Sequence, residues 1–390
     1  MFEQRLKQLR LARGLSLEAL AAAMGGVVTK QSLSKYELGR ARPTPSVSTK
    51  LAAALGVKAV DLWTAPTVEI QLMAYRKRAS LPKSEQERVE SLVRQSLEER
   101  VRVQELMGQR DDPALPVHAM QICHIKDVER AAEELRLKWN LGMDPIASVV
   151  GVLEDQRIHV LSIEANEKFD GLSAVAIKNG AVAAAAVVTR EGVPGERQRL
   201  NLAHELGHLV LKIEGDMDSE KAAFRFGAAF LAPASTLIQE VGAKRGLIHQ
   251  EELLLLKQRF GLSVQALLRR LCDLDVINLS CYKQWCMKVN KLGWRKREPN
   301  ELPPEQPIWL RQSVLHALAE GWLTKDDAER MLGQSLDWDQ PLTLVERLAF
   351  MELPLDERRR QLAEQAAGIA EHYTYDREWE DLEAGDFIDE

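Results

Sequence analysis

The chain has 390 residues, of which 45% are hydrophobic and 28% charged, and its formal net charge is −6. These proportions are ordinary for a globular protein and exclude a chain that is disordered throughout, while the length predicts several domains. The longest apolar stretch, residues 181–188, is far below the ~20 residues of a membrane-spanning helix, and no signal peptide is evident. With only four scattered cysteines as well, we expect a cytoplasmic protein that contacts no membrane.

The first 64 residues predict a small helical domain with a basic surface. Residues 2–12, 17–24, 29–36 and 47–55 have the apolar spacing of short helices, with Ser16 and Thr29 placed to cap two of them. A fifth short helix completes the region before position 64. This stretch contains ten basic and four acidic residues, a balance that favours contact with phosphates.

Residues 1–64 resemble the lambda-repressor-like, XRE-type helix-turn-helix domain. The resemblance is carried by Leu17-Glu-Ala-Leu-Ala, Ser32-Leu-Ser-Lys-Tyr-Glu-Leu-Gly-Arg and Leu51-Ala-Ala-Ala-Leu-Gly-Val. It implies five helices, double-stranded DNA as a partner, and a homodimer if the operator is symmetric. The residues that it places against bases or phosphates are Lys30, Gln31, Ser32 and Lys35, with Arg40 and Arg42 on the DNA backbone. The departure is Leu17, where the family commonly has Gln; a protein-docking module of the same fold is the alternative.

The segment 65–116 alternates acids and bases with few apolar positions, which predicts a charged helical linker that closes at Pro113 and Pro116. Residues 117–290 then predict an α+β domain. Three strands are expected at 158–163, 172–177 and 181–188, the last two joined by a tight turn at Asn179-Gly180. We expect a small antiparallel sheet whose edge could hold an extended peptide beside a long helix at 197–211.

That long helix carries the most informative motif of the chain, His204-Glu-Leu-Gly-His208. On a helix the two histidines lie one turn apart on one face, so both imidazoles can bind one Zn²⁺, with Glu205 beside them as a general base for an attacking water. The flanking residues are apolar on most sides, and a buried helix does not hold two imidazoles and a carboxylate without partners. The motif predicts a metal-dependent peptidase.

Two histidines leave the ion short of protein ligands. Glu220, at the start of a predicted helix over 219–230, is the preferred third ligand, while Glu214, Asp216 and Asp218 in the preceding loop are alternatives. A third histidine of the longer metzincin pattern is excluded, because that pattern needs glycine at 211 and histidine at 214. Among the other histidines, His249 is the one candidate for polarising a substrate carbonyl.

Residues 120–333 resemble the ImmA/IrrE family of zinc metallo-endopeptidases. The resemblance is carried by Arg197-Gln-Arg-Leu-Asn-Leu-Ala-His-Glu-Leu-Gly-His, Glu220-Lys-Ala-Ala-Phe-Arg-Phe-Gly-Ala-Ala-Phe and Phe260-Gly-Leu-Ser-Val-Gln-Ala-Leu. It implies a zincin-like peptidase domain over 117–290, a helical extension over 291–333, zinc as cofactor, and His204, His208 and Glu220 as its ligands. It further implies cleavage of a helix-turn-helix repressor. The chain departs from the family at Phe224, where a polar residue is usual.

The last segment, 334–390, is acidic and predicts a helical tail. It resembles small bacterial antitoxins at Leu344-Val-Glu-Arg-Leu-Ala-Phe and Glu378-Trp-Glu-Asp-Leu-Glu-Ala-Gly-Asp-Phe. The resemblance implies a toxin as partner, with the anchors Trp379, Leu382, Phe387 and Ile388; a solvated terminus is the alternative.

The fold class expected from these segments is mainly α and multidomain. The expected function is a zinc-dependent regulatory endopeptidase that binds DNA and cleaves a repressor or antitoxin, so controlling a stress, mobile-element, toxin-antitoxin or phage-defence locus. The alternative is a DNA-binding antitoxin or repressor whose peptidase fold is idle and whose acidic tail neutralises a toxin.

Overall fold

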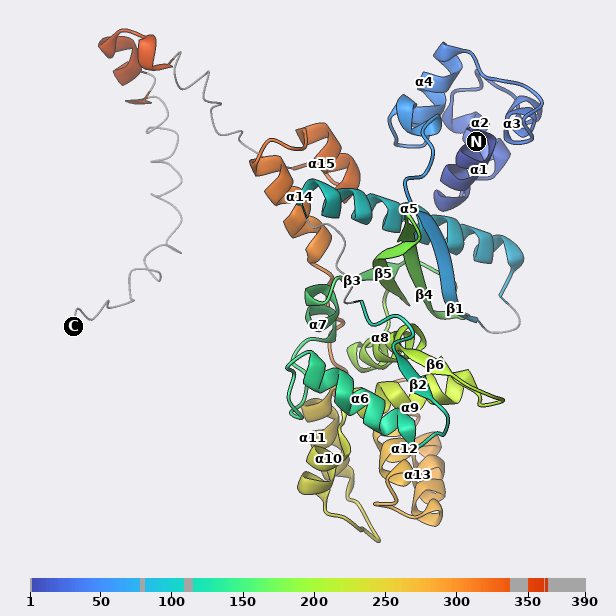
Figure 1. Ribbon diagram of the computed structural model, residues 1–390, viewed down its shortest axis with the longest axis vertical. Helices are drawn as coiled ribbons and strands as arrows, with labels where there is room; N and C mark the ends of the chain where they lie inside the picture. Colours follow the sequence, from blue (N-terminus) through green and yellow to red (C-terminus); the bar gives the residue numbers. More distant parts are fainter. Residues whose placement is uncertain (1, 78–80, 109–114, 337–349, 361, 364–390) are drawn as a thin grey trace. The chain divides into compact units, whose positions relative to one another are not determined.

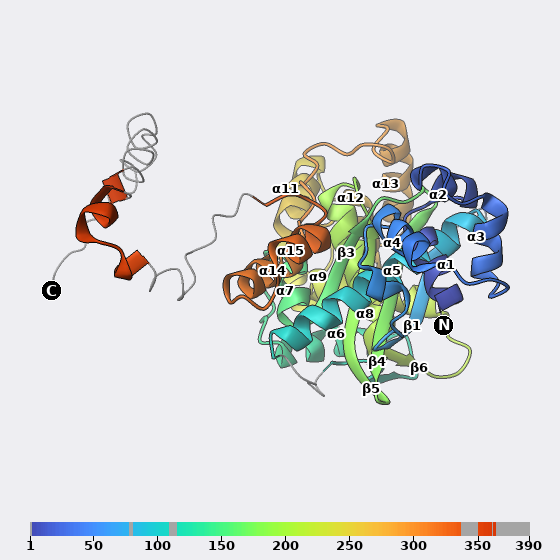
Figure 2. The ribbon, with the colours of Figure 1, turned by 90° about the horizontal axis from the view of Figure 1, so that it is seen from above.

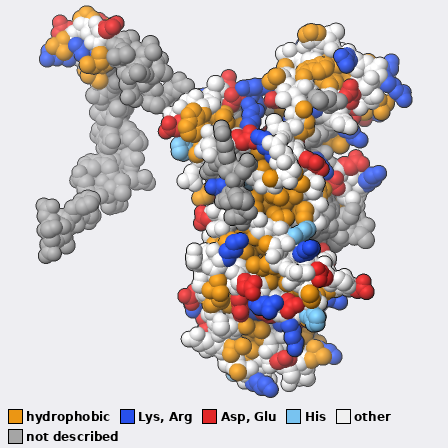
Figure 3. All heavy atoms as spheres, viewed as in Figure 1, with side chains coloured by type: hydrophobic (Ala, Val, Ile, Leu, Met, Phe, Trp, Pro, Cys, Tyr) orange, Lys and Arg blue, Asp and Glu red, His pale blue; other side chains and the backbone are white. Residues whose placement is uncertain are grey.

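The computed structural model describes residues 2–77, 81–108, 115–336, 350–360 and 362–363. The chain forms two compact units, residues 1–334 and 335–390. In the first unit helices predominate over a small mixed sheet (Figures 1 and 2), which confirms the mainly α, multidomain class. Acidic and basic side chains are interspersed on the face of this unit seen in Figure 3, with hydrophobic side chains between them. None of the helices in the described part is long and apolar enough to cross a membrane.

The N-terminal region is helical as predicted. Its elements are α1 (Phe2–Ala12), α2 (Leu17–Ala23), α3 (Lys30–Glu37), α4 (Pro45–Ala54) and a 3-10 turn, η1 (Ala59–Leu62). Ser16 and Thr29 cap α2 and α3, because their side chains accept hydrogen bonds from the amides of Ala19 and Ser32. Buried Leu6, Leu20, Leu33 and other apolar residues form a core of their own for these helices.

The sheet has four strands in the order β1-β4-β5-β3, with bounds β1 (Glu69–Lys77), β3 (Ile158–Ile163), β4 (Phe169–Lys178) and β5 (Ala181–Arg190). The β4–β5 hairpin turns at Asn179 and Gly180, whose φ angles are 52° and 81°, as the Asn-Gly pair predicted. The prediction of an antiparallel sheet is wrong in one respect, since β3 pairs parallel with β5. The helix α7 (Val149–Asp155) leads directly into β3. This strand lies beside β5, at the edge of the sheet opposite β1.

The prediction of a helical linker over 65–116 is also wrong in part. Its residues 83–106 do form a helix, α5 (Lys83–Leu106), but Glu69–Lys77 is strand β1, which pairs antiparallel with β4. Val68 and Ile70 are buried and Leu72 packs against the same core, a period-2 pattern that is only three residues long. The segment is therefore part of the folded sheet rather than a spacer, and α5 also packs on α1 of the N-terminal helices.

Two helices cover the two faces of the sheet (Figure 1). On one face α5 contributes Val89, Val93 and Leu97 to a core with the inward residues of β4 and β5. On the other face lies the motif helix, α8 (Gly195–Val210), whose Leu202 and Leu206 belong to the larger core. That core is completed by α6 (Asp127–Lys138), α9 (Ser219–Leu231), α10 (Ala234–Val241), α11 (Gln250–Phe260), α12 (Val264–Asp273) and α13 (Leu279–Lys291). A second, two-stranded sheet pairs β2 (Met120–Ile122) parallel with β6 (Leu211–Ile213).

The extension after position 291 begins as a loop, and the helices expected within it follow at 309–332. Its helices are α14 (Trp309–Ala319) and α15 (Lys325–Leu332). The preceding loop lies against the start of α8: the amide of Gly195 donates to the carbonyl of Leu302 at 2.8 Å, and Glu305 forms an ion pair with Arg199. The loop therefore stabilises the helix that carries the motif.

In the second unit, residues 350–352, 355–360 and 362–363 are helical. The proposed toxin anchors Trp379, Leu382, Phe387 and Ile388 lie outside the described residues.

Candidate metal centre

The motif helix α8 is held inside the unit by both apolar and ionic contacts. His204 and Glu205 are fully buried, and the first turn of the helix carries Glu196, which is 3% exposed. The ammonium of Lys257 on α11 donates to Glu196 at 2.6 Å and to Glu298 at 3.0 Å. Because these three charges are buried together, they fix α8 against α11 and the following loop, at the cost of desolvating each group.

Three ligand-type atoms converge at the end of α8. The Nε2 atoms of His204 and His208 are 3.1 Å apart, and the carboxylate of Glu220 lies 3.4 Å from the first and 3.2 Å from the second. Ligands about 2.0–2.1 Å from a tetrahedral zinc ion are separated by about 3.3 Å. The spacing and the nitrogen and oxygen donors therefore fit Zn²⁺, and within the described part of the chain this is the group able to hold a metal ion.

The position of Glu220 follows from how α9 begins and how closely it approaches α8. Asp218 caps α9 by accepting hydrogen bonds from the amides of Glu220 and Lys221 at 3.0 and 3.1 Å, and these bonds lower the pKa of Asp218. A Cβ added to Gly227 would lie 3.0 Å from the amide nitrogen of His204. Two glycines at this crossing, Gly207 and Gly227, thus let the two helix backbones approach to the distance that the ligand set needs.

The alternative ligands from the preceding loop have other partners. Glu214 contacts Gln121 and the thiol of Cys123 at the end of the small sheet. Asp218 is the cap of α9, and Asp216 is exposed. The structure brings Glu220, and none of these three, to the histidines.

The carboxylate of Glu205 lies against strand β4 at Gly171. A Cβ at this position would be 2.4 Å from Oε1 of Glu205, so only glycine leaves room for the carboxylate as it stands. The strand is tied to α8 at the same place, because Arg197 forms an ion pair with Asp170 at 2.8 Å and Asn201 donates to the Asp170 carbonyl at 3.3 Å. Sequence patterns alone did not identify Gly171 or Asn201 as site residues, because the contact between β4 and α8 joins segments about thirty residues apart.

A hollow of about 340 Å³ opens beside His208 and Glu220, and its lining includes His118 and Met73. His118 is held there by its amide, which donates to the carbonyl of Leu209 at 2.7 Å. Met73 comes from β1, at the irregularity where the strand slips by one residue against β4. The prediction for His249 is not supported, because that residue stands at the start of α11 and is not among those that line the hollow.

On the other side of the ligands, Phe224 packs on His204 with ring centroids 4.2 Å apart. Phe224 nevertheless remains 41% exposed. Where the resemblance leads one to expect a polar side chain, this chain therefore places an apolar ring directly behind a ligand histidine.

The residues predicted to touch DNA lie on α3 and the loop after it. Lys30, Gln31 and Lys35 are exposed on α3, and Lys30 also pairs with Glu18. Ser32 is half-buried, and its amide donates to the capping hydroxyl of Thr29. The remaining two, Arg40 and Arg42, are exposed in the following loop. The arrangement leaves one side of α3 open to a partner.

Comparison with known proteins agrees with this two-part arrangement. Residues 6–62 match the helix-turn-helix family, and residues 184–272, which contain His204, Glu205, His208 and Glu220, match the IrrE N-terminal-like domain of the M78 peptidases. The chain joins a helix-turn-helix domain to an IrrE-like peptidase domain.

Over 57 residues the chain is 42% identical to an uncharacterized, prophage-derived HTH-type transcriptional regulator, YonR, of Bacillus subtilis. That match covers 15% of this chain and 51% of the regulator. No solved structure matches the chain. The IrrE-like match begins within β5, so Gly171 and the strand β4 that it belongs to precede the matched residues.

Proposed function

We propose that this protein is a zinc-dependent regulatory endopeptidase in which His204, His208 and Glu220 bind the metal and Glu205 is the general base. The observation that carries the proposal is the convergence of the three ligand atoms, which lie 3.1 to 3.4 Å apart. The buried carboxylate of Glu205 directly follows the first ligand, His204, on the same helix. The IrrE-like match over the same residues supports it.

The residues of the site divide the work of hydrolysis. A bound zinc ion would supply electrophilic activation of the scissile carbonyl and of the attacking water. Glu205 accepts the proton of that water and can then deliver it to the leaving amine. Burial of Glu205 against Gly171 holds its carboxylate in one place, so little rearrangement is needed when the proton moves. His118, at the rim of the hollow, is placed to contact the substrate.

The helix-turn-helix domain gives this peptidase a second partner, double-stranded DNA. Lys30, Gln31, Ser32 and Lys35 would face bases or phosphates, with Arg40 and Arg42 on the phosphate backbone. We infer that the protease acts in the cytoplasm at or near an operator, as a homodimer on a symmetric site, and that its substrate is a helix-turn-helix repressor or an antitoxin-type protein. The likeness to a transcriptional regulator supports this role.

Cleavage tests the enzymatic proposal directly. The zinc-loaded full chain is incubated with each purified helix-turn-helix protein encoded at its own locus, and the products are identified by mass spectrometry. The matched control is Glu205→Gln, which keeps the shape of the side chain and the three ligands but removes the base. We expect cleavage by the wild type only; absence of cleavage by the zinc-loaded wild type would favour the DNA-binding regulator with an idle peptidase fold.

DNA binding is tested separately on the locus's own promoter fragment. Lys35→Ala should weaken binding to all sequences and reduce the slope of log affinity against log salt by about one. Gln31→Ala should instead reduce discrimination between operator and unrelated DNA. Unchanged affinity in both variants would favour a protein-docking role for this domain.

A further inference from the structure

A second hollow, of about 460 Å³, lies between α8, α9 and α12 on the Phe224 side of the metal centre. Phe224 lines it and also packs on His204, so the hollow begins one side chain away from a proposed ligand. Leu200, which also lines it, lies one helical turn before His204 on α8. The 340 Å³ hollow beside His208 lies at the other end of the ligand group. A peptide bound across the metal would therefore extend one of its ends toward this second hollow.

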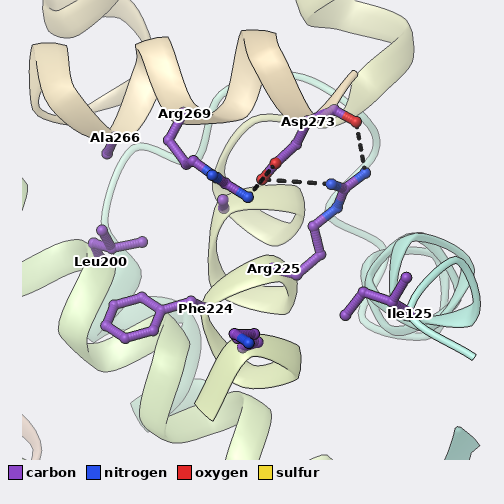
Figure 4. Close-up of a pocket in the computed structure, with 9 residues that line it drawn as sticks. Ile125, Leu200, Phe224, Arg225, Ala266, Arg269 and Asp273 are labelled. Atoms are coloured by element: carbon purple, nitrogen blue, oxygen red, sulfur yellow. Dashed lines mark hydrogen bonds and ion pairs between the residues drawn. The ribbon is translucent and has the colours of Figure 1, made fainter. Parts of the chain in front are cut away.

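One side of this hollow is apolar. Figure 4 shows Leu200, Phe224 and Ala266 together on that side, and Ile125 and Ala228 also line the hollow. Ile125 and Phe224 are 43% and 41% exposed, although both are large hydrophobic residues. Exposed apolar side chains that gather around a concavity next to a reactive centre mark a binding site for an apolar group.

The opposite side is charged. Asp273 lies between two guanidinium groups, at 2.9 Å from Arg269 and 3.4 Å from Arg225, and Figure 4 shows both pairs. Lys221 also lines the hollow and pairs with Asp218 at 3.4 Å, while Arg225 forms a further ion pair with Glu129. The one acid of the lining, Asp273, is held by two guanidinium groups, so the hollow favours no basic substrate side chain.

Given the zinc peptidase proposed above, on which this inference rests, we propose that the hollow is the specificity pocket for an aliphatic or aromatic side chain next to the scissile bond. Phe224 determines its apolar character and joins it to the metal centre. Burial of a leucine or phenylalanine side chain in such a pocket strengthens binding roughly tenfold to a hundredfold relative to glycine.

Hydroxamates test this without knowledge of the natural substrate, because a hydroxamate binds zinc and carries one chosen side chain. Two series are used, with the side chain on the acyl side or on the amine side of the zinc-binding group, each with glycine, leucine, phenylalanine and lysine members. Calorimetry on the zinc-loaded full chain gives the affinities. In one series we expect leucine and phenylalanine to bind at least ~10-fold tighter than glycine, and lysine no tighter than glycine.

Ala266→Phe fills the hollow from α12 and should abolish the preference for leucine without changing the affinity for glycine hydroxamate. If this variant is unstable, Ala228→Leu fills the hollow from α9 and should have the same effect. Leu255→Phe, on the exposed side of α11, is the matched control and should behave as wild type. Equal affinity for glycine and leucine in both series overturns the pocket but leaves the metal centre standing. Failure of every hydroxamate to bind overturns the proposed function and the pocket with it.

Discussion

Gly171→Ala tests whether the strand beside the motif helix positions the general base. The new Cβ would lie 2.4 Å from Oε1 and 3.0 Å from Cδ of Glu205, well inside any real contact distance. The backbone of Gly171 cannot recede, because it is paired with Thr189 on one side and Arg76 on the other. The carboxylate of Glu205 must therefore move by at least about 0.6 Å.

A displacement of at least about 0.6 Å approaches the roughly 1 Å misplacement that costs on the order of 10² in rate, which lies within the 10² to 10⁴ that general-base catalysis contributes. We expect kcat/KM for cleavage of the protein substrate to fall by roughly that factor, about 2.7 kcal/mol in transition-state stabilisation. Zinc affinity, measured by competition with a chromophoric chelator, should not change, because Gly171 does not touch the three ligands.

The matched control is Gly246→Ala, since nothing lies within 4 Å of a Cβ there. This variant should cleave at the wild-type rate. Wild-type cleavage by Gly171→Ala would refute the positioning of Glu205 by β4. Loss of zinc together with activity would point instead to a general collapse of the site.

Three further changes have separable outcomes. Gly227→Ala pushes α9 away from the backbone of His204, so zinc affinity should fall at least tenfold while the helix content in circular dichroism is retained. Lys257→Met leaves two buried carboxylates without their cation, and urea denaturation should show a loss of roughly 3–5 kcal/mol. Burial lowers the pKa of His159 well below 6.5, so below that pH the unfolded chain binds more protons than the folded chain and the free energy of unfolding falls as the pH drops. The difference in the free energy of unfolding between about pH 7.5 and about pH 5.5 should therefore be smaller in His159→Gln than in the wild type.

The sequence predicted the elements that local rules determine. The caps Ser16 and Thr29, the Asn179-Gly180 turn and the two-histidine helix follow from spacing and turn chemistry within a few residues, and the structure contains each of them. Glu220 could be ranked first among the acids because it opens a helix with a small, apolar face.

What the sequence concealed depends on distant segments. Strand β1 is marked only by the short alternation of Val68, Ile70 and Leu72, and its partner β4 lies about one hundred residues away in sequence. The parallel pairing of β3 with β5 likewise joins two strands that are separated in the sequence by the whole of β4. The contact of Gly171 with Glu205 and the packing of Phe224 on His204 also arise only when the strands and helices come together.

The most direct test of the metal centre is zinc stoichiometry and affinity for the full chain, determined by elemental analysis and chelator competition in three proteins: wild type, Glu220→Ala and Glu214→Ala. The expected result is one zinc ion per chain, with an affinity lowered at least tenfold by Glu220→Ala and unchanged by Glu214→Ala, because the Glu214 carboxylate contacts Gln121 and Cys123 instead. Absence of bound zinc in the wild type, or equal affinity in wild type and Glu220→Ala, would contradict it.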